Sequence, residues 1–479
     1  MSARESFATV ASRGRSVPAW LIRWHRLLAW PALAAILLWG ATGVMHPVMS
    51  ALSPVPAHPP AAQPLPAGLR PVAPPLPRTL TALRLTLLEG RPAWRVHGDG
   101  VVRWFDAYSG IELAGADARE AERLARAFTG DAASPVARIA QVTAFGPDYL
   151  PMNKLLPVWR VDFARDDGLT AFVDTDGGRL ATLTDDSKRV LSTVFSAVHR
   201  WSWAGEGTFK RMGIGLLVGA AFVTLCGGLA LYVLRWRAGT LRASQPAGRR
   251  LHRALGLLAV SAGLALTGSG LIHLWLARPN PPTPVVQPLP GAAPLAAVPQ
   301  GVEALIAVAI DGAPVWLAAT AAGGSHAEHA HHHHQHAAPG GLPRYFDGAA
   351  WLPETAARRH AAQLARAAGA PAAPVARVTL VTRFGGEYGF FQKRLPVYRI
   401  DFAAPGRPAW YVEPATGAFS TRVEETDRLE GYLFSWLHKW HWLDGLGKTP
   451  RDAILVAFVL VNMLAALVGI GLWRRRGRR

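Results

Sequence analysis

The sequence predicts a membrane α-helical protein in which four transmembrane helices, related by an internal duplication, carry two α+β domains on one side of the bilayer. Three observations support this fold class. The 479-residue chain has four uncharged spans long enough to cross a bilayer, its two halves align with each other, and arginine clusters at alternate ends of the spans. Half of the residues are hydrophobic, 17% are charged and 18 are tryptophan, a residue enriched at membrane interfaces.

Arginine predicts how the spans are oriented. The N-terminal arm 1–26, the loop 235–253 and the tail 474–479 are arginine-rich, and short segments of that kind stay on the cytoplasmic side. The formal net charge of +19 is therefore an orientation signal and not the basic stripe of a nucleic-acid-binding protein. We expect both termini in the cytoplasm and the long segments 48–210 and 277–451 outside. The expected spans are residues 27–47, 211–234, 254–276 and 452–473.

The first span is expected to be a retained anchor. Its apolar stretch is long for a signal peptide, and no small-residue cleavage site follows it closely. The single cysteine, Cys226, lies within the second span, so the outer segments contain no disulfide. A lone cysteine also excludes the C-x-x-C-H attachment motif, and any haem must therefore be bound non-covalently.

The duplication is visible as constant offsets between the two halves. The first span maps onto the third with an offset of 227, and RPAWRV at 91–96 maps onto APVWLA at 313–318 with an offset of 222. RWFDAYSG at 103–110 matches RYFDGAAW at 344–351 with an offset of 241, and the offset then stays at 239 through VFSAVHRWSW. The change from 222 to 241 indicates an insertion of 19 residues in the first hairpin loop of the second domain.

Each outer segment is expected to be an α+β domain behind an extended Pro-rich linker, at 53–77 and at 279–294. In the first domain, residues 118–128 have helical composition, and Asp117 is placed to cap that helix. Apolar and polar residues alternate in two pairs of short segments, as they do in paired strands. The expected strands are residues 94–96, 101–105, 158–163 and 171–173.

Two spans carry a histidine at each end with the same separation. His25 and His46 flank the first span, His252 and His273 flank the third, and each pair is 21 residues apart. A helix of that length places its two imidazoles roughly 30 Å apart, about the thickness of the hydrocarbon core of a bilayer. A b-type haem needs two axial imidazoles at matching depths. The sequence therefore predicts two non-covalent b haems and electron transfer across the membrane.

At the inner face, His25 and His252 are the expected axial ligands, because no other histidine lies there. Arg26 and Arg253 follow them directly. These two arginines are candidate partners of the haem propionates, although the positive-inside rule also accounts for them.

At the outer face there are four candidate ligands, because His199 and His438 occupy equivalent positions before the second and fourth spans. The helix face shared with the inner ligands favours His46 with His273. His199 and His438 then complete the outer haem, bind a further haem or line the acceptor site, and the sequence leaves these alternatives open. Small residues near the outer histidines would admit a flat macrocycle or serve ordinary helix packing. They are Gly40, Gly43, Gly268 and Gly270.

Several motifs resemble the PepSY-associated transmembrane-helix family. They are GRPAWRV and WFDAYSG in the first hairpin, LPVWRVDF and FVDTDGG after it, the His-Arg entry to the first and third spans, and FSAVHRWSW. That family includes inner-membrane ferrisiderophore reductases. The resemblance covers nearly the whole chain and implies a bacterial inner-membrane protein with haem between four helices and PepSY domains in the periplasm. His441, whose repeat partner is Ser202, and the insertion depart from the pattern.

The insertion, residues 324–341, is a low-complexity segment expected in an exposed hairpin loop. Clustered neutral imidazoles bind zinc, copper, nickel or iron with little selectivity, so a metal-scavenging role and a passive polar insertion both fit. Its histidines are His326, His329, His331, His332, His333, His334 and His336.

The leading hypothesis is an oxidoreductase, a transmembrane b-type cytochrome that reduces a periplasmic acceptor, namely a ferric siderophore. No nucleotide-binding or flavin-domain motif is found, and the inner loops are too short for such a domain, so electrons must come from the quinol pool or a separate cytoplasmic reductase. Two alternatives remain. One is a haem-free PepSY anchor that binds peptides, proteases or metals to regulate a partner. The other is a reductase of copper or another periplasmic metal.

Overall fold

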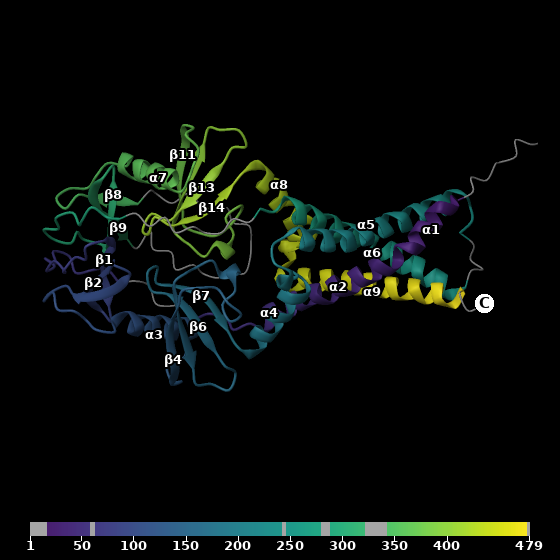
Figure 1. Cartoon of the computed structure of the whole chain (residues 1–479), viewed down its shortest axis with the longest axis horizontal. Helices are drawn as coiled ribbons and strands as arrows, with labels where there is room; N and C mark the ends of the chain where they lie inside the picture. The colour runs from purple at the N-terminus through teal and green to yellow at the C-terminus, as the bar shows by residue number, and fades with distance from the viewer. Residues whose placement is uncertain (1–16, 58–62, 242–245, 279–287, 321–342, 477–479) are drawn as a thin grey trace, which may run out of the picture. The chain divides into compact units, whose positions relative to one another are not determined.

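The computed structural model describes residues 17–57, 63–241, 246–278, 288–320 and 343–476 (Figure 1). The chain divides into two compact units, each built from both halves of the sequence. We call them the helical unit (residues 1–50, 194–277 and 432–479) and the sheet unit (residues 51–193 and 278–431). The His-rich insertion, with its expected metal-binding histidines, lies outside the described residues.

Within the described residues, the helical unit contains four helices that are long and apolar enough to cross a membrane. Figure 1 shows them as a bundle, with the short helix α1 (Ala19–Leu27) beside α5. Each overlaps an expected span and extends beyond it, so the four expected spans are confirmed as helices. They are α2 (Ala29–Leu52), α5 (Thr208–Arg237), α6 (Ala247–Leu276) and α9 (Lys448–Arg476).

The two histidine-bearing spans differ in one respect from the expectation. His252 and His273 lie on the single helix α6, but the first span is interrupted at Leu28, which separates His25 on α1 from His46 on α2. Pro31 accounts for the break, because a proline has no N–H for the carbonyl four residues earlier and its ring clashes with that carbonyl. Leu258 occupies the equivalent position in α6, where the helix continues.

Small and polar residues hold the helices together. Helix α2 packs on α5 through Ala32, Ala35 and Ala221, all of them buried. Between α6 and α9, the side-chain amide of Asn462 donates a hydrogen bond of 3.1 Å to the carbonyl oxygen of Ala259. Small side chains allow helix backbones to approach closely, which is how helices associate where no hydrophobic effect drives them together.

The described part of the sheet unit forms one six-stranded and two four-stranded antiparallel sheets. The six-stranded sheet has the order β10-β9-β8-β1-β2-β3, and its strands are β1 (Leu80–Leu88), β2 (Arg91–Gly98), β3 (Val101–Asp106), β8 (Val302–Ile310), β9 (Ala313–Thr320) and β10 (Arg344–Phe346). The repeats join where Arg84 pairs with Ile306, two residues separated by the repeat offset of 222. The duplication therefore places a local twofold axis between β1 and β8.

Each repeat adds a helix and a four-stranded sheet. The first repeat has α3 (Ala116–Thr129) with β4 (Val136–Val142), β5 (Val158–Phe163), β6 (Thr170–Asp174) and β7 (Arg179–Thr184). The second has α7 (Thr355–Ala367) with β11 (Val375–Val381), β12 (Val397–Phe402), β13 (Ala409–Val412) and β14 (Phe419–Val423). The remaining helices are α4 (Asp186–Val198) and α8 (Glu425–Leu433), with short turns at Pro151–Asn153, Ser202–Ala204, Phe390–Gln392, Phe434–His438 and His441–Leu446.

The four expected strands and the expected helix of the first domain are confirmed. The expected cap is wrong: the residue before α3 is Gly115, no side chain caps the helix, and Asp117 is buried in its first turn. Burial is possible because Arg95 and two indoles neutralise and bond the Asp117 carboxylate.

The Pro-rich linker is also more than a spacer. Its described part between 53 and 77 contains neither helix nor strand, as expected, but Leu65 and Leu69 are buried against the six-stranded sheet. This part of the linker therefore contributes to the hydrophobic core.

Candidate functional site

His25 and His252 make equivalent hydrogen bonds in the two repeats. The Nδ1 atom of His25 lies 3.1 Å from the carbonyl oxygen of Thr224 on α5, and that of His252 lies 2.9 Å from the carbonyl oxygen of Ala465 on α9. A carbonyl oxygen only accepts hydrogen bonds, so Nδ1 carries the proton and Nε2 keeps its lone pair. Backbone carbonyls commonly orient metal-binding histidines in this way.

Two glycines leave room for these imidazoles. A Cβ atom added at Gly228 would lie 3.1 Å from Cε1 of His25, and one added at Gly469 would lie 2.9 Å from Cε1 of His252. Each glycine follows the carbonyl acceptor by four residues and therefore lies on the same face of its helix. Neither glycine is among those expected near a histidine from the sequence, although their separation of 241 residues repeats that of the acceptors Thr224 and Ala465.

The two candidate propionate partners, Arg26 and Arg253, differ in burial. Arg253, next to His252, has a buried Nη1 atom with no hydrogen-bond partner among the described residues. Arg26 is exposed. A buried guanidinium N–H without a partner costs free energy, and a carboxylate is the group that best satisfies it. This orphaned donor beside an oriented imidazole fits a haem with its propionates.

His199 and His438 are oriented by hydroxyl groups. The Nδ1 atom of His199 lies 2.9 Å from Oγ1 of Thr42 on α2, and that of His438 lies 3.1 Å from Oγ of Ser269 on α6. Each hydroxyl already donates its single proton to the carbonyl four residues earlier, at Leu38 or Ala265. The hydroxyls must therefore accept from Nδ1–H, and Nε2 again keeps its lone pair.

His46 and His273 have a different environment. Their rings lie against Phe195 and Phe434, with centroids 5.9 and 4.3 Å apart, and the same phenylalanines stack on His199 and His438 at 4.5 Å. In each repeat a phenyl ring thus contacts both candidate outer ligands. The sequence favours His46 with His273, and the structure adds that the Nδ1 atoms of His199 and His438 are held by hydroxyl groups.

The glycines singled out in the sequence have separate roles. A Cβ at Gly270 would lie 3.9 Å from Cε1 of His438, whereas one at Gly40 would contact Met463 and one at Gly268 would contact Phe222. At Gly43, a Cβ would meet no described atom within 4 Å. Gly40 and Gly268 therefore serve helix packing, and Gly270 is the one of the four that adjoins a candidate ligand.

Burial favours the neutral form of His199 and His438. Burial, followed by the nearby His46 and Arg200, lowers the pKa of His199 to about 4. Burial, followed by His199 and His273, lowers the pKa of His438 to about 3. The imidazoles of His199 and His438 are close enough for their charges to interact, as are those of His25 and His252. Neutral imidazoles are the form that binds iron.

Within the described residues, no group of three or more His, Cys, Asp or Glu side chains is arranged to hold a metal ion. Paired histidines instead suit a metal that brings its own equatorial ligands, as haem iron does. The helices and sheets define a candidate multi-pass membrane protein with three antiparallel sheets. No protein-family model matches the chain, and no curated protein matches it.

Proposed function

We propose that the protein is a transmembrane b-type cytochrome of the PepSY-associated transmembrane-helix type, which transfers electrons from the cytoplasmic side or the quinol pool to a ferric siderophore in the periplasm. The observation that carries the proposal is the repeated orientation of four imidazoles. His25, His199, His252 and His438 each use Nδ1 in a hydrogen bond to a neighbouring helix, and each repeat supplies two of them.

The proposed ligands form two pairs across the repeats. His25 and His252 hold the inner haem, where Arg253 offers its unpaired Nη1 atom to a propionate. His199 and His438 hold the outer haem, while His46 and His273 contact the same two phenylalanines, Phe195 and Phe434. When bound, each haem b supplies a one-electron carrier at one face of the membrane.

The chemistry of the acceptor sets the electron balance. Each ferric ion accepts one electron and becomes ferrous, so a quinol that loses two electrons and two protons on the inner side reduces two ferric ions outside. Siderophores hold ferric iron through hard oxygen ligands, and the softer ferrous ion is bound more weakly by such ligands. Reduction therefore releases the iron. The two sheet-bearing repeats are proposed to be PepSY-like domains on the periplasmic side, and the chain is proposed to reside in a bacterial inner membrane.

Haem content is the direct test. Purified protein should show a Soret band that shifts on addition of dithionite, and the pyridine haemochrome assay should give two haems per chain. Alanine at His25 or His252 should remove one haem, and alanine at His199 or His438 should remove the other. His441→Ala is the matched control, because His441 bonds Asp444 and has no histidine at the equivalent position.

Two results would contradict the proposal. Purified protein that contains no haem would instead support the alternative of a haem-free membrane anchor. Loss of the second haem on replacement of His46 or His273, with retention on replacement of His199 and His438, would restore the pairing that the sequence favours. Sealed vesicles then test direction: a reductant confined to the face of the arginine-rich segments should release ferrous iron from an impermeant ferric chelate on the other face.

A further inference from the structure

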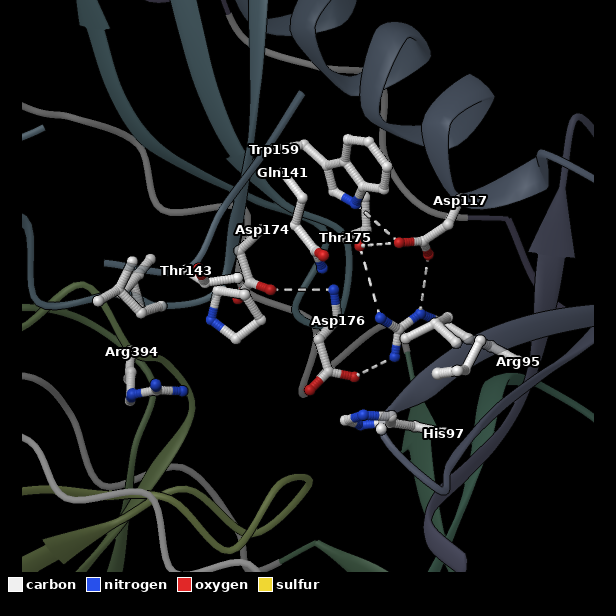
Figure 2. Close-up of a pocket in the computed structure, with 16 residues that line it drawn as sticks. Arg95, His97, Asp117, Gln141, Thr143, Trp159, Asp174, Thr175, Asp176 and Arg394 are labelled. Atoms are coloured by element: carbon white, nitrogen blue, oxygen red, sulfur yellow. Dashed lines mark hydrogen bonds and ion pairs between the residues drawn. The ribbon is translucent and has the colours of Figure 1, made fainter. Parts of the chain in front are cut away.

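The sheet unit contains a polar cavity of about 390 Å³ that is lined by the first repeat and by Arg394 of the second (Figure 2). It lies where the hairpin β2–β3, the strands β4 and β5 and the turn after β6 meet. Its lining includes both charged and neutral polar side chains. They are Arg95, His97, Gln141, Asp174, Asp176 and Arg394.

One wall of this cavity is fixed by a buried ion pair. The side chain of Arg95 is 7% exposed and lies 3.2 Å from a carboxylate oxygen of Asp117 and 2.7 Å from one of Asp176. Asp117 also accepts hydrogen bonds from the indoles of Trp104 and Trp159, at 2.9 and 2.7 Å. Arg95 therefore serves as a support that holds Asp176 in place.

Other groups remain available to a ligand. The Asp176 side chain is 39% exposed, and its second carboxylate oxygen has no hydrogen-bond partner among the described residues. The side chains of His97 and Gln141 make no hydrogen bond within the described part of the chain. Arg394 donates one N–H to a carboxylate oxygen of Glu413, at 2.7 Å. In the view of Figure 2, Arg394 and His97 lie on opposite sides of the cavity, with Asp176 between them.

The second repeat shows that the fold does not need five of these polar groups. It forms the same hairpin, helix and sheet with apolar residues at the five equivalent positions, although Asp174 has the buried Glu413 as its counterpart, and a buried ion pair generally stabilises a fold no better than apolar residues of similar size. Strand register and burial define the equivalences. Arg95, His97, Asp117, Gln141 and Asp176 correspond to Leu317, Ala319, Ala357, Leu380 and Ala415.

We propose that the cavity binds a small zwitterion, with its ammonium group at Asp176 and His97 and its carboxylate at Arg394 on the other side. The second carboxylate oxygen of Asp176 and the remaining N–H groups of Arg394 favour a ligand that carries both charges, because each of these groups would otherwise lose hydration without full compensation. The volume lies near the lower end of the roughly 300–1,000 Å³ of small-molecule sites, which suits an amino acid or dipeptide. The proposal does not depend on haem binding.

Calorimetry on the full-length protein in nanodiscs tests the site with glycylglycine as the probe. Glycylglycine should bind at least about tenfold more tightly than ethylamine or acetate, which each carry one of its charges. Asp176→Asn and Arg394→Gln should each weaken binding by about tenfold or more. Asp148→Asn and Arg407→Gln are matched controls, since these side chains are exposed and do not line the cavity, and they should change nothing.

His97→Ala guards against a folding artefact, because the second repeat carries Ala319 at the equivalent position. This variant should keep the melting temperature and weaken glycylglycine binding. The proposal is overturned if glycylglycine does not bind, or if the three cavity variants all bind it as the wild type does. Equal affinity for acetate and glycylglycine would also overturn it, because the site would then recognise an anion alone.

Discussion

The hydroxyl of Ser269 on α6 accepts a hydrogen bond from Nδ1 of His438, with 3.1 Å between the two atoms. Thr42 on α2 makes the equivalent contact with His199 at 2.9 Å. In both repeats, a hydroxyl on a candidate membrane-spanning helix thus fixes the ring of a histidine that precedes the next such helix. The contact recurs in both repeats although the hydroxyl belongs to threonine in one and to serine in the other.

Thr42→Ala and Ser269→Ala should therefore weaken haem binding at the outer site. Each substitution removes the acceptor of an Nδ1–H group, and loss of such a partner typically costs about 10- to 100-fold in affinity. The measurement is the haem-to-protein ratio after dialysis against apomyoglobin, together with the midpoint potential of the retained haem. Thr42→Ser should behave as the wild type.

Thr267→Ala is the control for these variants. Its hydroxyl donates to the carbonyl oxygen of Gly263 on the same helix and contacts no histidine. If Thr267→Ala lowered the haem content as much as Ser269→Ala did, loss of a helix hydroxyl would explain the effect and the orienting role of Ser269 would be wrong.

Deletion of residues 324–341 should leave the fold, the haem content and siderophore reduction in metal-free buffer unchanged. The strands on either side, β9 and β10, pair directly with each other, from Ala318 with Arg344 to Trp316 with Phe346. The equivalent hairpin of the first repeat closes with only two residues, Asp99 and Gly100, between β2 and β3. Melting temperature, haem ratio and ferrous-iron release check the prediction. Loss of reduction would instead make the insertion part of the acceptor site.

Much of the fold follows from the sequence because its signals are local or repeated. Uncharged spans predict the long helices, and the alternation of residues around Trp94 and Val161 predicts the strands. The repeat offsets bring the histidines into equivalent positions. The interruption of the first span at Leu28 can also be predicted from the sequence, because Pro31 lies within this span and its counterpart in the third span is Leu258.

The remainder depends on contacts between residues far apart in the chain. An aspartate before a helix favours capping by local chemistry, but Asp117 instead binds Arg95, which lies 22 residues earlier. From the sequence, the hydroxyls of Thr42 and Ser269 are expected to donate hydrogen bonds within their own helices, and both do so. Each hydroxyl also accepts a hydrogen bond from a histidine more than 150 residues away. The periodicity of the sequence does not indicate this second hydrogen bond.

The sheet unit should lose stability in mild acid through His360. Its Nδ1 atom lies 2.7 Å from the hydroxyl oxygen of Tyr345, and burial lowers its pKa from 6.5 to about 3. Below pH 6.5 the unfolded chain binds a proton that the folded chain does not take up until about pH 3. Stability is therefore fully present above pH 6.5 and falls by up to about 1.4 kcal/mol per pH unit below it.

The comparison of two proteins at two pH values isolates this effect. His360→Gln keeps a hydrogen-bonding group but has no proton to gain, so its melting temperature should drop less than that of the wild type between pH 7.5 and pH 5. All other titrating groups are common to both. Parallel losses in the two proteins would show that His360 does not contribute to acid sensitivity.

The inner haem should be sensitive to a single methyl group on α5 or α9. A Cβ at Gly228 would stand 3.1 Å from Cε1 of His25, and at Gly469 it would stand 2.9 Å from Cε1 of His252. In Gly228→Ala and Gly469→Ala the imidazole must therefore shift away from the new methyl group, which weakens its hydrogen bond to the carbonyl that orients it, and we expect about a tenfold loss of inner haem. Gly219→Ala and Gly471→Ala are the controls, because a Cβ there meets no described atom within 4 Å. Haem content and the low-spin electron paramagnetic resonance signal of each haem provide the measurement. Retention of both haems in the Gly228 and Gly469 variants would show that the imidazoles lie elsewhere when haem is bound, and that His25 and His252 are not its ligands in the orientation described.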